Sequence, residues 1–176
     1  MKVLVINGSP RAKGNSDILC DEFIRGAEEA GHQVEKLSLR EKNFFPCKAC
    51  YACFRTGQCV QEDDMAEILK KAENADVFLL ASPTYFLTMS GQMKVMIDRL
   101  LPRWQDLGGK EAYVIVTGHD GKKGLERNAE DLVRILENLG DRVRQVIWGE
   151  YVWQKGEVIG TKAMEEAYLA GKGIGK

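Results

Sequence analysis

Long apolar runs are missing from this sequence of 176 residues, and none approaches the roughly 18 residues that a membrane-spanning helix needs. No basic segment followed by an apolar one opens it, so nothing in it predicts export. An excess of charge of one sign is also missing, because 25 lysines and arginines stand against 26 aspartates and glutamates. A surface for a polyanion is therefore not expected. We expect a soluble, cytoplasmic protein that binds neither nucleic acid nor membrane.

Two common phosphate-binding motifs are absent as well. The sequence contains no G-x-x-x-x-G-K-[ST], and no G-x-G-x-x-G with an acidic residue after the second strand. ATP hydrolysis and a Rossmann-type NAD site are therefore poorly supported. No Ser/His/Asp set or carboxylate pair offers itself for catalysis, so we assign no catalytic residue. There is no internal repeat or linker either, and the length suits a single domain over residues 1–176.

Apolar and amphipathic segments alternate five times along the chain. The apolar segments predict strands near residues 2–7, 34–39, 77–81, 112–117 and 143–147. The amphipathic segments predict helices near residues 17–30, 64–74, 91–101, 125–139 and 161–170. This alternation predicts an α/β fold with a doubly wound, five-stranded parallel sheet and helices on both faces. With the strand order 2-1-3-4-5, a ligand would bind beyond the carboxyl ends of the first and third strands.

The loop at residues 8–16, which follows the first strand, has the composition of a phosphate site. Two glycines allow a tight turn, and the polar or charged side chains beside them are Ser9, Arg11, Asn15 and Ser16. The helix that starts at Asp17 and Ile18 adds backbone N–H groups and the positive end of its dipole. A phosphate monoester would be well held here. The alternative is an ordinary turn in which Ser16 only caps the helix.

The loop after the third strand offers a place for a flat ring. Pro83 stiffens its backbone, Thr84 provides a hydroxyl, and Tyr85 and Phe86 provide flat apolar surfaces. A planar aromatic ligand needs such surfaces together with hydrogen bonds at its edge. The alternative is that both aromatic residues simply pack over the following helix.

Cysteines are concentrated in residues 40–63, which interrupt the alternation of strands and helices. In a cytoplasmic chain, cysteines favour metal or redox chemistry over structural disulfides. The four in this segment are Cys47, Cys50, Cys53 and Cys59. Their bunched C-x2-C-x2-C-x5-C spacing favours a [4Fe–4S] cluster, whereas zinc more often takes two separated pairs. Two alternatives remain open for this segment: a zinc site, or no metal with free thiols or a labile disulfide. Cys20, which lies apart from the four, is predicted to be a small core residue.

These motifs together resemble one family. Residues 8–16 match the phosphate loop G-S-P-R-x-x-G-N-S/T of flavodoxin-like NAD(P)H-dependent FMN reductases completely. Residues 82–99 resemble the same family's S-P-x-Y-x…S-x-x-x-K-x-x-I-D-R segment. The cysteine spacing resembles that of the iron–sulfur flavoproteins, a branch of this group. The similarity covers nearly all of residues 1–150.

The resemblance implies a flavodoxin-like fold, FMN as cofactor and NAD(P)H as co-substrate. It implies that the first loop binds the phosphate, and that Pro83, Thr84, Tyr85 and Phe86 carry the isoalloxazine ring. The loop after the fourth strand, made of Thr117, Gly118 and His119, would close the pocket. His119 would either donate to the flavin or be a polar loop residue beside it. The helix at residues 91–101 often forms a dimer interface in this family, so we expect a homodimer or homotetramer.

We therefore expect an FMN-dependent oxidoreductase that passes electrons to a small molecule or to a protein acceptor such as ferredoxin. Two alternatives remain: an NAD(P)H:FMN or quinone-type reductase without a cluster, and a non-catalytic flavin electron carrier. Near the end of the chain, Trp148, Tyr151 and Trp153 are predicted to be core or interface residues. Residues 171–176 are predicted to be a frayed terminus.

Overall fold

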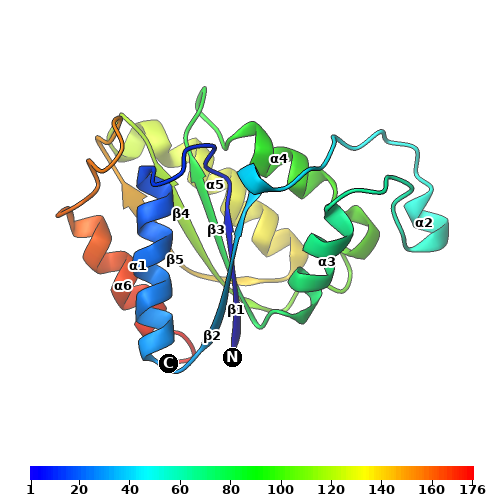
Figure 1. Cartoon of the computed structure of the whole chain (residues 1–176), viewed down its shortest axis with the longest axis horizontal. Helices are drawn as coiled ribbons and strands as arrows, with labels where there is room; N and C mark the ends of the chain where they lie inside the picture. The colour runs from blue at the N-terminus through cyan, green and yellow to red at the C-terminus, as the bar shows by residue number, and fades with distance from the viewer.

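The computed structural model describes all 176 residues, and its five strands form one parallel sheet. The strands are β1 (Lys2–Asn7), β2 (Gln33–Ser38), β3 (Val77–Pro83), β4 (Glu111–Thr117) and β5 (Arg142–Gly149). Their order in the sheet is β2-β1-β3-β4-β5, and every neighbouring pair is parallel (Figure 1). The predicted strand order and fold class are confirmed.

Helices cover both faces of the sheet. They are α1 (Asn15–Glu29), α2 (Cys53–Thr56), α3 (Met65–Asn74), α4 (Gly91–Asp98), α5 (Lys122–Leu139) and α6 (Lys162–Lys172), with short 3-10 helices η1 (Leu39–Glu41) and η2 (Leu101–Arg103). Helices α1 and α6 lie side by side on one face, and α3, α4 and α5 cover the other (Figure 1). None of the helices combines the length and the apolar composition that crossing a membrane would require.

Two apolar cores, one on each face, hold these layers together. Alternation along β1 sends Val3 and Val5 into the core beneath α1 and α6. It sends Leu4 and Ile6 into the core beneath α3, α4 and α5. All of β3 is buried, as a central strand covered on both faces must be. The edge strand β2 instead alternates between exposed and half-buried residues along its first four positions.

Two glycines let α1 and α6 approach each other closely. A Cβ atom on Gly26 of α1 would lie 2.1 Å from a carbonyl oxygen of α6, and one on Gly171 would lie 2.0 Å from a carbonyl oxygen of α1. No other residue fits where two helix backbones come this near. Gly171 is buried, and so is Ile174 beyond it. The prediction of a frayed terminus at residues 171–176 is therefore wrong, because this end of the chain packs against α1 and the sheet.

Replacing Gly26 with alanine should lower the free energy of unfolding by about 3 kcal/mol, because the two helices would have to move apart. Urea unfolding followed by circular dichroism measures this change. Gly91→Ala is the matched control, since a Cβ atom there would meet no other atom within 4 Å. We expect the control to stay within about 0.5 kcal/mol of the wild type. Equal stability of the two variants would contradict the close packing of α1 on α6.

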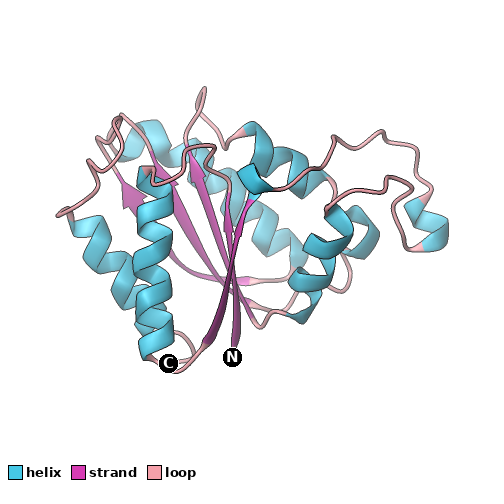
Figure 2. Cartoon of the chain, viewed as in Figure 1, coloured by secondary structure: helices cyan, strands magenta, loops and turns pink.

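The segment between η1 and α3 leaves the layered body of the protein. Residues 42–51 have no regular secondary structure, and the single helical turn α2 follows them. Figure 2 shows the segment extending past α3 and α4 as a loop that turns back on itself. This is the stretch where the sequence predicts an insertion at residues 40–63.

Candidate functional site

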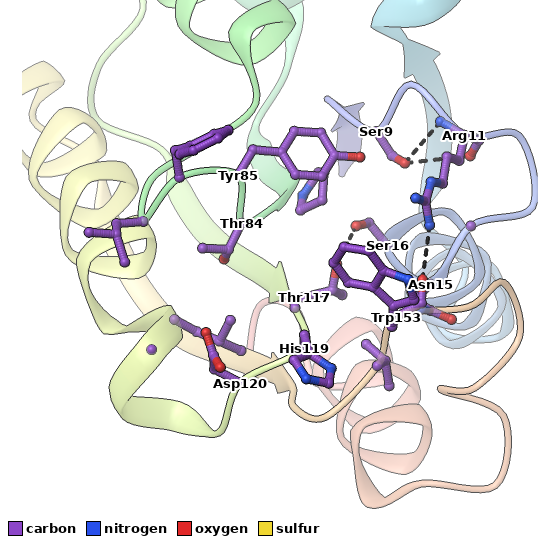
Figure 3. Close-up of a pocket in the computed structure, with 18 residues that line it drawn as sticks. Ser9, Arg11, Asn15, Ser16, Thr84, Tyr85, Thr117, His119, Asp120 and Trp153 are labelled. Carbon is purple, nitrogen blue, oxygen red and sulfur yellow. Dashed lines mark hydrogen bonds between the residues drawn. The ribbon is translucent and has the colours of Figure 1, made fainter.

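A pocket of about 340 Å³ opens at the carboxyl ends of the strands. The loops after β1, β3, β4 and β5 line it, and the sheet register places Pro83 beside Thr117. Every predicted residue of the phosphate and ring sites lines this pocket except Asp17 and Ile18 (Figure 3). The residues that line it are Ser9, Arg11, Asn15, Ser16, Pro83, Thr84, Tyr85, Phe86, Thr117, Gly118 and His119. The topology therefore gathers residues that lie far apart in the sequence.

The loop after β1 is shaped by its own polar groups. The Arg11 amide donates to Ser9 Oγ at 3.2 Å, and the Gly14 amide donates to the Arg11 carbonyl at 3.1 Å. Gly14 is the N-cap of α1 and offers no side-chain acceptor. Because the first N–H groups of a helix have no partner within it, those of Asn15 and Ser16 remain available. They lie at the positive end of the helix dipole, where an anion is stabilised.

Arg11 and Asn15 connect this loop to the chain that follows β5. Arg11 Nη1 donates to the Trp153 carbonyl at 2.9 Å, and its guanidinium lies 6.0 Å from the centre of the Trp153 ring. Asn15 donates to the Gln154 carbonyl at 2.8 Å and accepts from two amides in residues 156–158, at 3.0 and 3.3 Å. The side chain of Asn15 therefore braces the pocket, whereas Arg11 keeps further N–H groups for a ligand.

Asp17 and Ile18 lie behind the pocket. The Asp17 carboxylate accepts from the Asn7 side chain and from the Lys13 amide, both at 2.7 Å, and pairs with Lys36 at 2.6 Å. Burial alone would raise the pKa of Asp17, but these partners outweigh it and hold the pKa below its ordinary value. Ile18 packs against the core beneath α1. The structure thus places neither side chain at the pocket, and Asp17 holds the shape of the loop.

The loop after β3 forms a tight turn on another side of the pocket. Tyr85 and Thr88 exchange backbone hydrogen bonds of 2.9 and 3.3 Å, and the two residues between them take left-handed φ angles of 46° and 73°. Neither is glycine, so the turn carries backbone strain. Asn128 of α5 donates to the Thr84 hydroxyl at 3.0 Å and so holds it from behind. The Tyr85 side chain is partly exposed at the pocket and that of Phe86 fully exposed at its rim, so neither is a core residue.

The loop after β4 and the chain after β5 close the remaining sides. The hydroxyls of Thr117 and Ser16 are hydrogen-bonded at 2.7 Å. The rings of His119 and Trp153 meet edge to face, with their centroids 5.8 Å apart (Figure 3). Trp153 lines the pocket and is 58% exposed, so it is not a core residue. Its place could have been inferred from topology, because it follows β5 and the carboxyl ends of parallel strands share one edge.

The four clustered cysteines line a second pocket, of about 240 Å³. Cys47 and Cys50 are exposed, Cys53 and Cys59 are half-buried, and all four are free thiols. The structure contains no group of three His, Cys, Asp or Glu side chains that lie close enough together to share a metal ion, and this includes the four cysteines. The donor set thus suits a cluster by its chemistry and its shared cavity, although the sulfurs do not converge on one point. Cys20, by contrast, is buried, as predicted.

A buried ion pair lies beside the cysteine pocket. Arg99, just after α4, donates Nη1 and Nη2 to the Asp63 carboxylate at 2.8 and 3.0 Å, and Nη1 to the Phe45 carbonyl at 2.6 Å. Both charged side chains are 1% exposed. Asp63 also accepts from the Phe45 and Met65 amides at 3.2 and 3.1 Å. Burial alone would raise the pKa of Asp63, but these hydrogen bonds hold it below its ordinary value, so the carboxylate is ionised.

The chain is similar in sequence to iron–sulfur flavoproteins. One from Archaeoglobus fulgidus is 42% identical over 102 residues, which are 58% of this chain and 46% of that protein. A second from the same organism is 27% identical over 177 residues and covers 94% of this chain and 89% of its own. The chain spans about half the length of the iron–sulfur flavoproteins that it matches at 35% to 43% identity.

The fold and a family profile agree with this similarity. The crystal structure of an azoreductase from Bacillus anthracis superposes with a TM-score of 0.78 at 17% identity, covering 98% of this chain and 99% of that chain. At this identity the likeness concerns the fold alone. The profile of the NADPH-dependent FMN reductases matches residues 1–148, well over half of the sequence. The chain belongs to the NADPH-dependent FMN reductase family.

Proposed function

We propose that this chain is an FMN-dependent oxidoreductase, built as one domain over residues 1–176 with a cysteine-rich insertion at 40–63. The observation that carries the proposal is the pocket at the strand ends, where anion donors and flat aromatic walls come from different loops (Figure 3). Family membership supports FMN as the ligand and NAD(P)H as the co-substrate. When bound, FMN supplies the hydride and electron transfer, while the chain supplies binding, orientation and electrostatics.

The phosphate of FMN would lie at the loop after β1. Arg11 offers a charged, planar donor there, and the uncapped amides of Asn15 and Ser16 offer neutral ones. The hydrogen-bonded hydroxyls of Ser16 and Thr117 add an O–H donor at the same end. This set of donors suits one terminal phosphate, which favours FMN over a dinucleotide.

The isoalloxazine ring would lie between the loops after β3 and β4. Tyr85 and Trp153 provide aromatic surface at the pocket, and the Thr84 hydroxyl, held by α5, lies at the same opening. These side chains exclude water from one face of a flat ligand and fix its angle. His119 stands against Trp153 and would meet the edge of the ring or the solvent beside it.

We further propose that Cys47, Cys50, Cys53 and Cys59 hold a [4Fe–4S] cluster, which would supply one-electron transfer. The shared cavity and the names of the similar flavoproteins support this. Residues 42–51 form no helix or strand, so Cys47 and Cys50 can move toward Cys53 and Cys59 without breaking regular structure. A ferredoxin-type acceptor and a homodimer or homotetramer remain predictions.

Anaerobic reduction by NADH or NADPH tests the proposed function. The FMN-loaded protein should lose its oxidised flavin absorbance on addition of one of these nucleotides, and should oxidise more of it when an acceptor is added. Bound FMN that neither nucleotide reduces would indicate a flavin electron carrier instead. Turnover by protein that holds no iron would indicate the cluster-free NAD(P)H:FMN or quinone-type reductase.

Replacing Arg11 with alanine should weaken FMN binding by about 1.5–3 kcal/mol, the usual contribution of hydrogen bonds to a charged group. Riboflavin has no phosphate, so its affinity should change little. Calorimetric titration of both ligands measures the two effects.

Tyr85→Ala is the control that separates ring binding from phosphate binding, because it removes an aromatic side chain proposed to contact the isoalloxazine ring and leaves the phosphate donors in place. It should weaken FMN and riboflavin alike. If Arg11→Ala also weakened both ligands equally, the assignment of the phosphate to the loop after β1 would be wrong.

A further inference from the structure

Arg99 lies where the cysteine pocket meets the protein core. It lines that pocket together with the four cysteines and takes no part in the pocket at the strand ends. Its bonds to the Phe45 carbonyl and to Asp63 hold two points of the chain that lie on either side of the cysteines in sequence. One buried side chain therefore ties both ends of the cysteine segment to α4.

The guanidinium of Arg99 has N–H donors that form no hydrogen bond to Phe45 or Asp63. Its three bonds to Phe45 and Asp63 use three of the five N–H groups that an arginine carries. One of the two left over is at Nε, which is buried and has no partner in the chain. Burial alone would lower the pKa of Arg99, but the hydrogen-bonded Asp63 carboxylate raises it above its ordinary value, so the guanidinium is charged. A charged guanidinium with an unused donor thus lines the same pocket as Cys59.

We propose that Arg99 is the positioning residue of the cysteine site: it fixes both ends of the segment and donates a remaining N–H to the Cys59 sulfur when that sulfur is a metal-bound thiolate. This inference rests on the proposed cluster. A thiolate is a stronger acceptor than a thiol because it is charged. The unpaired N–H of Arg99 would therefore gain a strong acceptor when the cluster is bound. Donors of this kind orient metal ligands and tune the metal. An N–H donated to a cluster sulfur favours the more negative, reduced cluster, so the hydrogen bond from Arg99 raises the reduction potential.

The test compares two arginine variants in protein prepared without oxygen. Arg99→Lys keeps the positive charge opposite Asp63 but removes the planar fork and the Nε–H. Arg103→Lys is the matched control, since Arg103 is the next arginine along the chain, is 40% exposed and pairs with Glu73 at 3.0 Å. We expect Arg99→Lys to lose iron to a chelator about 10-fold faster than the wild type or more. Its cluster should also have a more negative reduction potential, while the control matches the wild type in both.

Each outcome bears on one of the two proposals. Wild-type protein without iron would end the cluster proposal, and this inference with it. If the wild type holds iron, and Arg99→Lys matches it in the rate of iron loss and in reduction potential, the role of Arg99 is overturned and the cluster proposal stands. The same holds if Arg99→Lys loses only thermal stability and keeps the wild-type potential. If Arg99→Lys does not fold, Arg99→Gln combined with Asp63→Asn removes both buried charges together, and the same expectations apply.

Discussion

Cys50→Ser protein prepared without oxygen should contain almost no iron, whereas the wild type should contain about four irons per chain. The cause is the ligand atom, because a serine hydroxyl is a poor replacement for a thiolate toward iron. The other three cysteines of the pocket should behave in the same way. Iron and acid-labile sulfide analysis measures the effect, and visible absorbance gives an independent record of it.

Cys20→Ala is the matched control for the cysteine variants. Cys20 is a free thiol like the others, but it is buried in the core beneath α1 and α6. Its replacement should cost some stability and leave the iron content at the wild-type level. Iron retained in Cys50→Ser, or lost equally in Cys20→Ala, would contradict the assignment of the cluster to the cysteine pocket.

Replacing Arg99 with alanine in metal-free protein should lower the free energy of unfolding by about 3–5 kcal/mol, because Asp63 would be left as an unpaired buried charge. The loss concerns the fold itself, since Arg99 ties the segment at residues 45–63 to α4 whether or not metal is bound. Urea unfolding measures it. Arg103→Ala, which removes a partly exposed ion pair with Glu73, should cost about 1 kcal/mol or less.

The stability difference between the wild type and Arg99→Ala should shrink as the pH falls. The pKa of Asp63 lies below its ordinary value in the folded wild type. The ion pair therefore contributes fully above the pKa of the unfolded carboxyl and is lost as the pH falls through the lowered folded value. In Arg99→Ala the guanidinium is gone, and burial raises the pKa of Asp63, so the carboxyl becomes neutral at a higher pH. A stability difference that stayed constant from neutral to acid pH would contradict an ionised pair.

The sheet and the two ligand loops could be predicted because each has a local signature. The apolar run at residues 77–81 can only be a buried strand, and the structure extends it to Pro83. Motif and topology together predict the loops after β1 and β3, since both follow buried strands at the point where strand order reverses. Their residues line one pocket, as expected. Strands and ligand loops can thus be predicted from sequence where residues close together in the chain determine the conformation.

The remaining features depend on contacts between distant residues. Trp153 reaches the pocket because Asn15, far away in sequence, holds residues 154–158. Arg99 follows an amphipathic helix in a run of mixed charge, where an arginine is ordinarily exposed, and only the folded position of Asp63 explains its burial. The cysteine spacing predicts which thiols act together, but whether their sulfurs meet depends on the fold of the segment between them.

The content of FMN, iron and sulfide in protein purified without oxygen tests the proposed flavin site and the proposed cluster together. We expect about one FMN, four irons and four sulfides per chain, together with loss of the oxidised flavin absorbance on addition of NADH or NADPH. Protein that takes up no FMN, or that holds FMN with no iron or with one zinc ion in its cysteine pocket, would contradict this expectation.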